Sequence, residues 1–142
     1  ADMDRFQNAL QRVAGKAKSQ RANLSGDDAA RYDNAYGQVI DAMNDITHRY
    51  SGMEAARWGL SVLHSHFMTA YTRSFDWLKV YGGAPTVYQA TSLLSACIFK
   101  DVLQEYFMLL VKELDAVQPR GLQGWLYEAR IPANSPILNT GK

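Results

Sequence analysis

The residues best suited to chemistry are three histidines, one cysteine and several carboxylates, and their spacing limits what they could do. His64 and His66 are two residues apart, so on a helix they point to different sides. Paired metal ligands on a helix need a spacing of three or four, which excludes these two as a metal pair. Asp101 and Glu105 share a helix face but lack any accompanying cationic or pocket-like pattern. We therefore favour a solvated or subunit-facing role over acid–base catalysis.

The other reactive residues also favour structural roles. His48 follows Asp45 by three residues, so the two are neighbours on a helix surface. Cys97 is the only cysteine and lies in an apolar run, so it can form no internal disulfide and is expected to pack. The sequence contains no Gly-rich phosphate loop, no Gly-x-Ser-x-Gly elbow and no Cys or His cluster. We therefore expect no enzyme activity, no metal and no cofactor.

The charge is unevenly distributed, although the net charge of the 142 residues is only +1. Five basic residues and no acid lie between Arg5 and Ser25, which leaves ten basic residues against fourteen acids elsewhere. A basic segment joined to a mildly acidic body is typical of a protein whose one end meets a polyanion or an acidic partner. The missing base-reading motifs favour sequence-independent contact with phosphates.

Hydrophobic periodicity predicts an all-α fold without significant strands, in a chain whose length suits one domain. Apolar residues recur at steps of three and four, and Ser-Gly, Gly-Pro and Pro-Gly clusters separate the periodic segments. The predicted helices span residues 3–23, from a Ser25 cap to about 49, 53–81, 86–117 and, as a short helix, 122–130. The uncharged run 80–99 is long enough to cross a bilayer, but glycines and a proline interrupt it, so we reject a transmembrane helix. No signal peptide begins the sequence, and we expect a product that is assembled inside a cell.

Three segments follow from these patterns. Residues 1–50 form a basic helix–turn–helix arm that contacts nucleic acid, residues 51–130 form a helical bundle, and residues 131–142 form an extended tail. We predict that the nucleic-acid-binding residues are Arg5, Arg12, Lys16, Lys18, Arg21 and Arg31.

Contact with other subunits is predicted for the fourth helix and the tail. Apolar residues occur nearly all round the fourth helix, which one small bundle can hardly cover. The tail has two prolines and no period, so we expect it to become ordered only against neighbouring subunits. The predicted subunit-interface residues are Trp58, Val102, Tyr106, Leu109, Ile137 and Leu138.

The stretch from residue 38 to residue 100 resembles the major coat proteins of filamentous and rod-shaped archaeal double-stranded DNA viruses. The resemblance covers less than half of the chain and rests on short elements. They are Gln38-Val39, Ser51-Gly52, Ala56-Arg57-Trp58-Gly59 and the turn Val80-Tyr81-Gly82-Gly83-Ala84-Pro85. It implies an N-terminal helical arm that wraps A-form-like DNA and a C-terminal bundle that packs against neighbouring subunits. In part of that family two related coat proteins form a heterodimer.

These observations together lead us to expect a structural coat protein that polymerises into a helical filament around double-stranded DNA and resides in the virion. Its partners are DNA, copies of itself and a paralogous coat subunit, and the sequence leaves a lipid envelope open. The sequence departs from the pattern of that family because acidic residues flank the basic arm, at Asp2, Asp4, Asp27 and Asp28. Two other classes stay open: a helical-bundle adaptor or secretion-associated protein that binds a protein partner, and a helical ligand sensor whose pocket is lined by aromatics of the third and fourth helices.

Overall fold

A computed structural model describes residues 4–21, 26–81 and 87–139, with side chains described except at 20–21, 27–28, 75–81 and 87–93. Every regular element in these ranges is a helix, which confirms the all-α prediction. The elements are α1 (Arg5–Arg21), α2 (Gly26–Arg49), α3 (Gly52–Tyr81), α4 (Val87–Val117), α5 (Gly121–Glu128) and the short 3₁₀ helix η1 (Pro136–Leu138). Helix ends agree with the predicted ones within two residues, apart from the predicted ends at 3, 23 and 86 and the predicted Ser25 cap, which lie outside the described residues.

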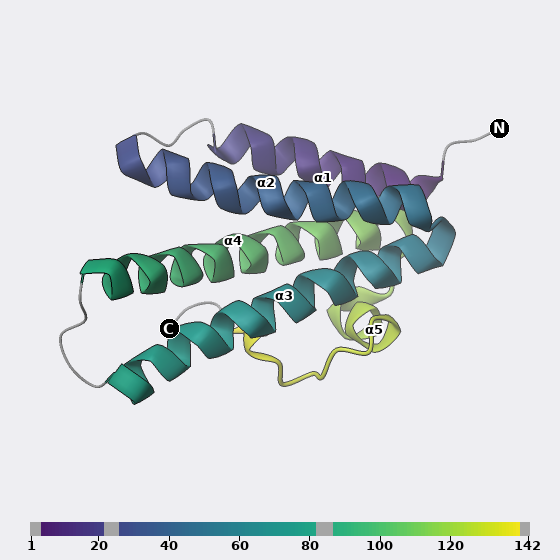
Figure 1. The fold of residues 1–142 in the computed structure, drawn as a ribbon. Coiled ribbons are helices and arrows are strands. Elements are labelled where there is room, and N and C mark those ends of the chain that lie inside the picture. Colours follow the sequence, from purple (N-terminus) through teal and green to yellow (C-terminus); the bar gives the residue numbers. More distant parts are fainter. Residues whose placement is uncertain (1–3, 22–25, 82–86, 140–142) are drawn as a thin grey trace.

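The four long helices form a bundle in which α4 occupies the central position. Figure 1 shows α1 beside α2, with α4 running between this pair and α3. The helix α5 and the C-terminal segment pack on α4 and α3. None of the described helices is both long and apolar enough to cross a membrane.

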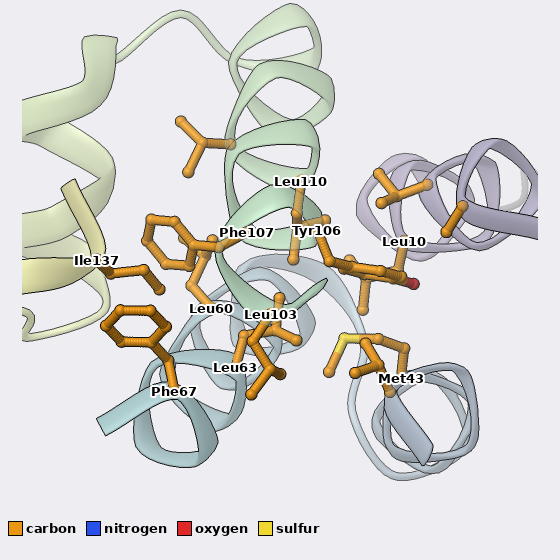
Figure 2. Packing of buried hydrophobic residues seen from close by; sticks show 14 of the residues in the cluster. Leu10, Met43, Leu60, Leu63, Phe67, Leu103, Tyr106, Phe107, Leu110 and Ile137 are labelled. Atoms are coloured by element: carbon orange, nitrogen blue, oxygen red, sulfur yellow. The ribbon is translucent and has the colours of Figure 1, made fainter. Parts of the chain in front are cut away.

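The central position of α4 explains why apolar residues surround it. Val102, Tyr106, Leu110 and Leu114 are fully buried within the chain itself. Figure 2 shows Tyr106 pointing toward Leu10 of α1, while other side chains of α4 point toward α3. The structure therefore differs from the expectation that neighbouring subunits cover α4, because α1, α2, α3 and α5 of the same chain do so.

The basic helix α1 packs as part of the same bundle, so the boundary expected at residue 50 does not separate two packing units. Its apolar stripe, which includes Leu10 and Val13, is buried. Asp4 caps α1 by accepting hydrogen bonds from the backbone N–H groups of Phe6 (2.9 Å) and Gln7 (3.2 Å). Asp4 also accepts one from the backbone N–H of Gly52, which ties the start of α1 to the start of α3.

The C-terminal segment folds back onto its own bundle rather than remaining free for a neighbour. Ile131 and Ile137 are buried, and Figure 2 shows Ile137 pointing toward Phe67 of α3. Gln104 of α4 donates from Nε2 to the carbonyl oxygens of Ile137 (2.9 Å) and Asn139 (2.5 Å). The expectation that the tail is ordered only by other subunits is therefore wrong for residues 131–139, and residues 140–142 lie outside the description.

One carboxylate fixes the turn between α4 and α5. Asp115 Oδ1 accepts hydrogen bonds from the backbone N–H groups of Arg120 (2.9 Å) and Gly121 (2.7 Å), and from Trp125 Nε1 (3.1 Å). These bonds hold the pKa of Asp115 below its usual range, the contribution of the Arg120 N–H being the largest. Gly121 begins α5 with φ 74°, a conformation that favours glycine. Asp115 thereby sets the direction of α5 and of the surface that α5 forms with α3.

Candidate nucleic-acid interface and docking grooves

The cationic stripe of α1 lies at the edge where α1 meets α4. Arg12 Nε lies 2.9 Å from Glu113 Oε2, and Lys16 Nζ contacts the other oxygen of the same carboxylate. The two basic side chains remain 48% and 50% exposed, whereas Glu113 is 12% exposed. Hydrogen bonds from Lys16 and then from Arg12 lower the pKa of Glu113. One carboxylate thus faces two cations, which leaves an excess positive charge at a solvent-accessible edge.

The other predicted nucleic-acid contacts do not all join this stripe. Arg5 and Lys18 are exposed and form no ion pair among the described residues. The backbone of Arg21 ends α1, but its side chain lies outside the description. Arg31 lies elsewhere, in a groove between α2 and α3. The described part of the predicted DNA surface is therefore Arg5, Arg12, Lys16 and Lys18, whose helix contains no acid.

A groove with exposed aromatic side chains lies between the start of α3 and the end of α5. It encloses about 680 Å³ and includes Trp58 and Tyr127 in its lining. Trp58 is 45% exposed and Tyr127 is 83% exposed. The ring of Tyr50 stacks on Trp58 with centroids 5.4 Å apart and an interplanar angle of 17°. Because this contact restrains the Trp58 side chain, the exposed indole costs little additional conformational entropy when a partner binds.

Glu128, which also lines this aromatic groove, forms two ion pairs. Glu128 accepts from Arg57 Nη2 (2.9 Å) through one oxygen and from Arg120 Nη1 (3.0 Å) through the other. Exposed Trp, Tyr and Arg side chains around a concave surface are the residue types that dominate protein–protein binding energy. The predicted interface residue Trp58 lies in this groove, together with Arg57 and Tyr127, which were not predicted as interface residues. Tyr127 could have been found from its position in α5 directly after the two buried residues Trp125 and Leu126.

Several other predicted interface residues lie inside the chain. Val102, Tyr106 and Ile137 have no exposed surface with which to contact another subunit. This corrects the sequence prediction, because the apolar character that suggested an interface serves the core of the bundle. Leu109 and Leu138 are partly buried against the same core. Leu94 and Met108 of α4, which were not singled out, are exposed at 41% and 37%.

The described His, Cys, Asp and Glu side chains do not form a metal centre. Among the described residues, no three His, Cys, Asp or Glu side chains are grouped as metal ligands would be. His64 instead lies with Nε2 2.7 Å from Ser135 Oγ, and burial lowers its pKa, which favours the neutral imidazole.

Comparison with known proteins finds no matching family model, curated protein or solved structure.

Proposed function

We propose that this protein is a structural coat subunit that assembles with other copies into a helical filament around double-stranded DNA, in the virion of a virus. The observation that carries the proposal is the composition and exposure of α1, which has five basic residues and no acid. Arg12 and Lys16 share a single carboxylate and stay half-exposed. Such a helix can neutralise phosphates without reading bases.

Self-assembly is supported by a different part of the surface. Trp58 and Tyr127 lie in a groove at the α3–α5 side, and Met108 is exposed on α4. A head-to-tail contact between unlike surfaces produces a helical filament when its rotation does not close into a ring. The resemblance to archaeal viral coat proteins supports the same proposal, with an A-form-like duplex and a paralogous coat subunit as further proposed partners.

Salt-dependent DNA binding tests the α1 proposal. Replacing Arg5 and Lys18 by alanine removes two cations that form no ion pair in the described structure. Each phosphate contact contributes about 0.9 to the slope of log affinity against log salt, so the double variant should lose about 1.8 from that slope on B-form duplex. A control variant, Arg49→Ala with Arg130→Ala, removes the same charge elsewhere and should keep the slope. An unchanged slope in the first variant would exclude these two residues from the DNA surface.

Electron microscopy of the protein with and without duplex DNA tests the assembly. The coat proposal requires filaments that form on DNA of any sequence. The alternative, favoured specifically by the aromatic groove, is a helical-bundle adaptor or secretion-associated protein that binds a protein partner through Trp58 and Tyr127. A small defined oligomer without DNA affinity at low salt would refute the coat proposal and support the adaptor.

A further inference from the structure

A second groove lies between α2 and α3 and has a floor of small side chains. Figure 1 shows α2 and α3 separating away from their common turn, with α4 between them. The groove encloses about 470 Å³, and α4 contributes Ser95, Ala96 and Phe99 to its lining. Ala35 of α2 and Ala70 of α3 also line it. Small side chains on three helices permit another polypeptide to approach closely.

The polar side chains that line this groove are basic or neutral. Arg73 and His66 come from α3, while Arg31 comes from α2 together with the neutral residues Asn34 and Gln38. None of the described residues that line the groove is acidic. The side chain of Arg73 is exposed and forms no ion pair among the described residues. Charge complementarity therefore calls for an anionic group in the occupant.

Two exposed acidic residues lie further along α2, on the outer face that also carries Asn34 and Gln38. Asp41 lies three residues after Gln38 and seven after Asn34, so the three side chains share one helix stripe. Asp41 is exposed and forms no ion pair among the described residues. One turn further, Asp45 is exposed and, among the described residues, forms an ion pair only with Arg49 of its own helix. A phosphate backbone lying along this face would be repelled by these acids, whereas a second copy turned by 180° would place acid against base twice.

We propose that this groove docks the outer face of α2 from a second copy, in a two-fold symmetric dimer with Asp41 of each copy against Arg73 of the other. α2 and α3 run antiparallel from the turn at 50–51, so Arg73 lies about 13 residues further from the turn than Asp41. This corresponds to roughly 20 Å along the bundle at 1.5 Å per residue, too far for a pair within one chain. Asn34 lies near the midpoint between Asp41 and Arg73 along the bundle, where the two-fold axis of this dimer passes. Its amide can therefore both donate to and accept from Asn34 of the second copy.

The proposed dimer does not depend on DNA binding. Figure 2 shows α1 and α4 on one side of the bundle and α2 and α3 on the other. The α1–α4 edge with Arg12 and Glu113 therefore stays uncovered when two copies meet through the α2–α3 groove. Failure of the wild-type protein to bind DNA would refute the coat proposal and leave the dimer unaffected.

Charge exchange provides the test, with dimerisation measured by sedimentation velocity at low and high salt. The wild type should dimerise at low salt and dissociate as salt rises. Asp41→Arg and Arg73→Asp should each weaken dimerisation at least about tenfold, since each places like charges together at two symmetric positions. The double variant should recover most of the wild-type affinity, because each pair is restored with opposite polarity. Matched controls on the exposed surface of α4, Asp101→Arg and Lys112→Asp, should dimerise like the wild type.

Three outcomes would overturn the proposal, provided that circular dichroism verifies that every variant is folded. They are a wild type that stays monomeric at low salt, single variants that still dimerise, and a double variant that fails to recover. A fourth outcome identifies a different occupant: loss of nucleic-acid or acidic-peptide binding in Arg73→Asp, without any effect of Asp41→Arg on self-association, would assign the groove to a polyanion.

Discussion

Replacing Glu113 by glutamine should destabilise the protein only where the carboxylate is ionised. The change keeps the size of a side chain that is 12% exposed and removes the charge that holds Arg12 and Lys16. Exposed ion pairs contribute about 0.2–1 kcal/mol each, and here both cations are half-exposed. The two pairs together therefore contribute roughly 1 kcal/mol to the free energy of unfolding. For a chain of this length that corresponds to a fall in Tm of about 3–4 °C at neutral pH.

The pH dependence of this difference gives a sharper test than its size. Because the pKa of Glu113 is lowered in the folded state, its ionised form stabilises the fold above the pKa of the unfolded chain, about 4.3. That contribution is lost as the pH falls through the lower, folded-state pKa. Thermal unfolding of both proteins from neutral to acidic pH should therefore show Tm values that converge at low pH.

A matched control separates this effect from a general loss of negative charge. Asp101→Asn removes a carboxylate whose side chain is 58% exposed and lies 3.5 Å from Lys100, so it should change Tm little. A Tm difference between wild type and Glu113→Gln that persists unchanged at the lowest pH would refute the ion-pair explanation. Equal Tm values at neutral pH would show that the two pairs contribute nothing measurable.

Three further substitutions test the packing of the bundle. Tyr106→Phe should leave the free energy of unfolding unchanged or raise it by about 1 kcal/mol, because the buried hydroxyl has no hydrogen-bond partner among the described residues; urea unfolding measures this. Gln104→Ala should lower the same free energy by about 1–2 kcal/mol through the loss of two hydrogen bonds to the C-terminal segment, and it should speed amide exchange in residues 131–139. Asp115→Asn should lower stability at neutral pH and less in acid, since the lowered pKa of Asp115 makes its contribution disappear as the pH falls through that pKa; Tm against pH tests it.

The helices could be predicted from the sequence because their signals are local. An apolar stripe such as Leu10, Val13 and Ala17 places one face of a helix in the core wherever that helix packs. Helix ends follow local rules too: Gly52 lies in the break expected between the second and third helices, and it begins α3 with φ 60°, which favours glycine. These signals require no knowledge of which elements meet, so they predicted the all-α fold correctly.

Local signals could not predict which elements pack against α4. An apolar surface has the same composition whether its own chain or another subunit covers it. Beyond α5 the C-terminal segment has no period, and Ile131 and Ile137 contribute single buried side chains rather than a stripe. Val102, Tyr106 and Leu110 of α4 are buried, but they are covered by the same chain and not by the neighbouring subunits that their apolar character suggested.

The carboxylate that pairs with the cationic stripe could not be predicted from the sequence either. Its ion pairs stabilise the fold, but they compete with DNA phosphates for the same two cations. Glu113 lies 101 residues after Arg12 in sequence, so the absence of acids within α1 gave no hint of it. If α1 contacts phosphates, Arg12 and Lys16 must exchange their carboxylate partner for the phosphate. Glu113→Gln removes this competitor, so the variant that unfolds more easily should bind duplex DNA more tightly and with a steeper salt dependence. An adaptor that uses only the Trp58 groove would show the loss of stability without any gain in DNA affinity. The sign of the correlation between stability and DNA affinity at this one position therefore distinguishes the two proposed functions.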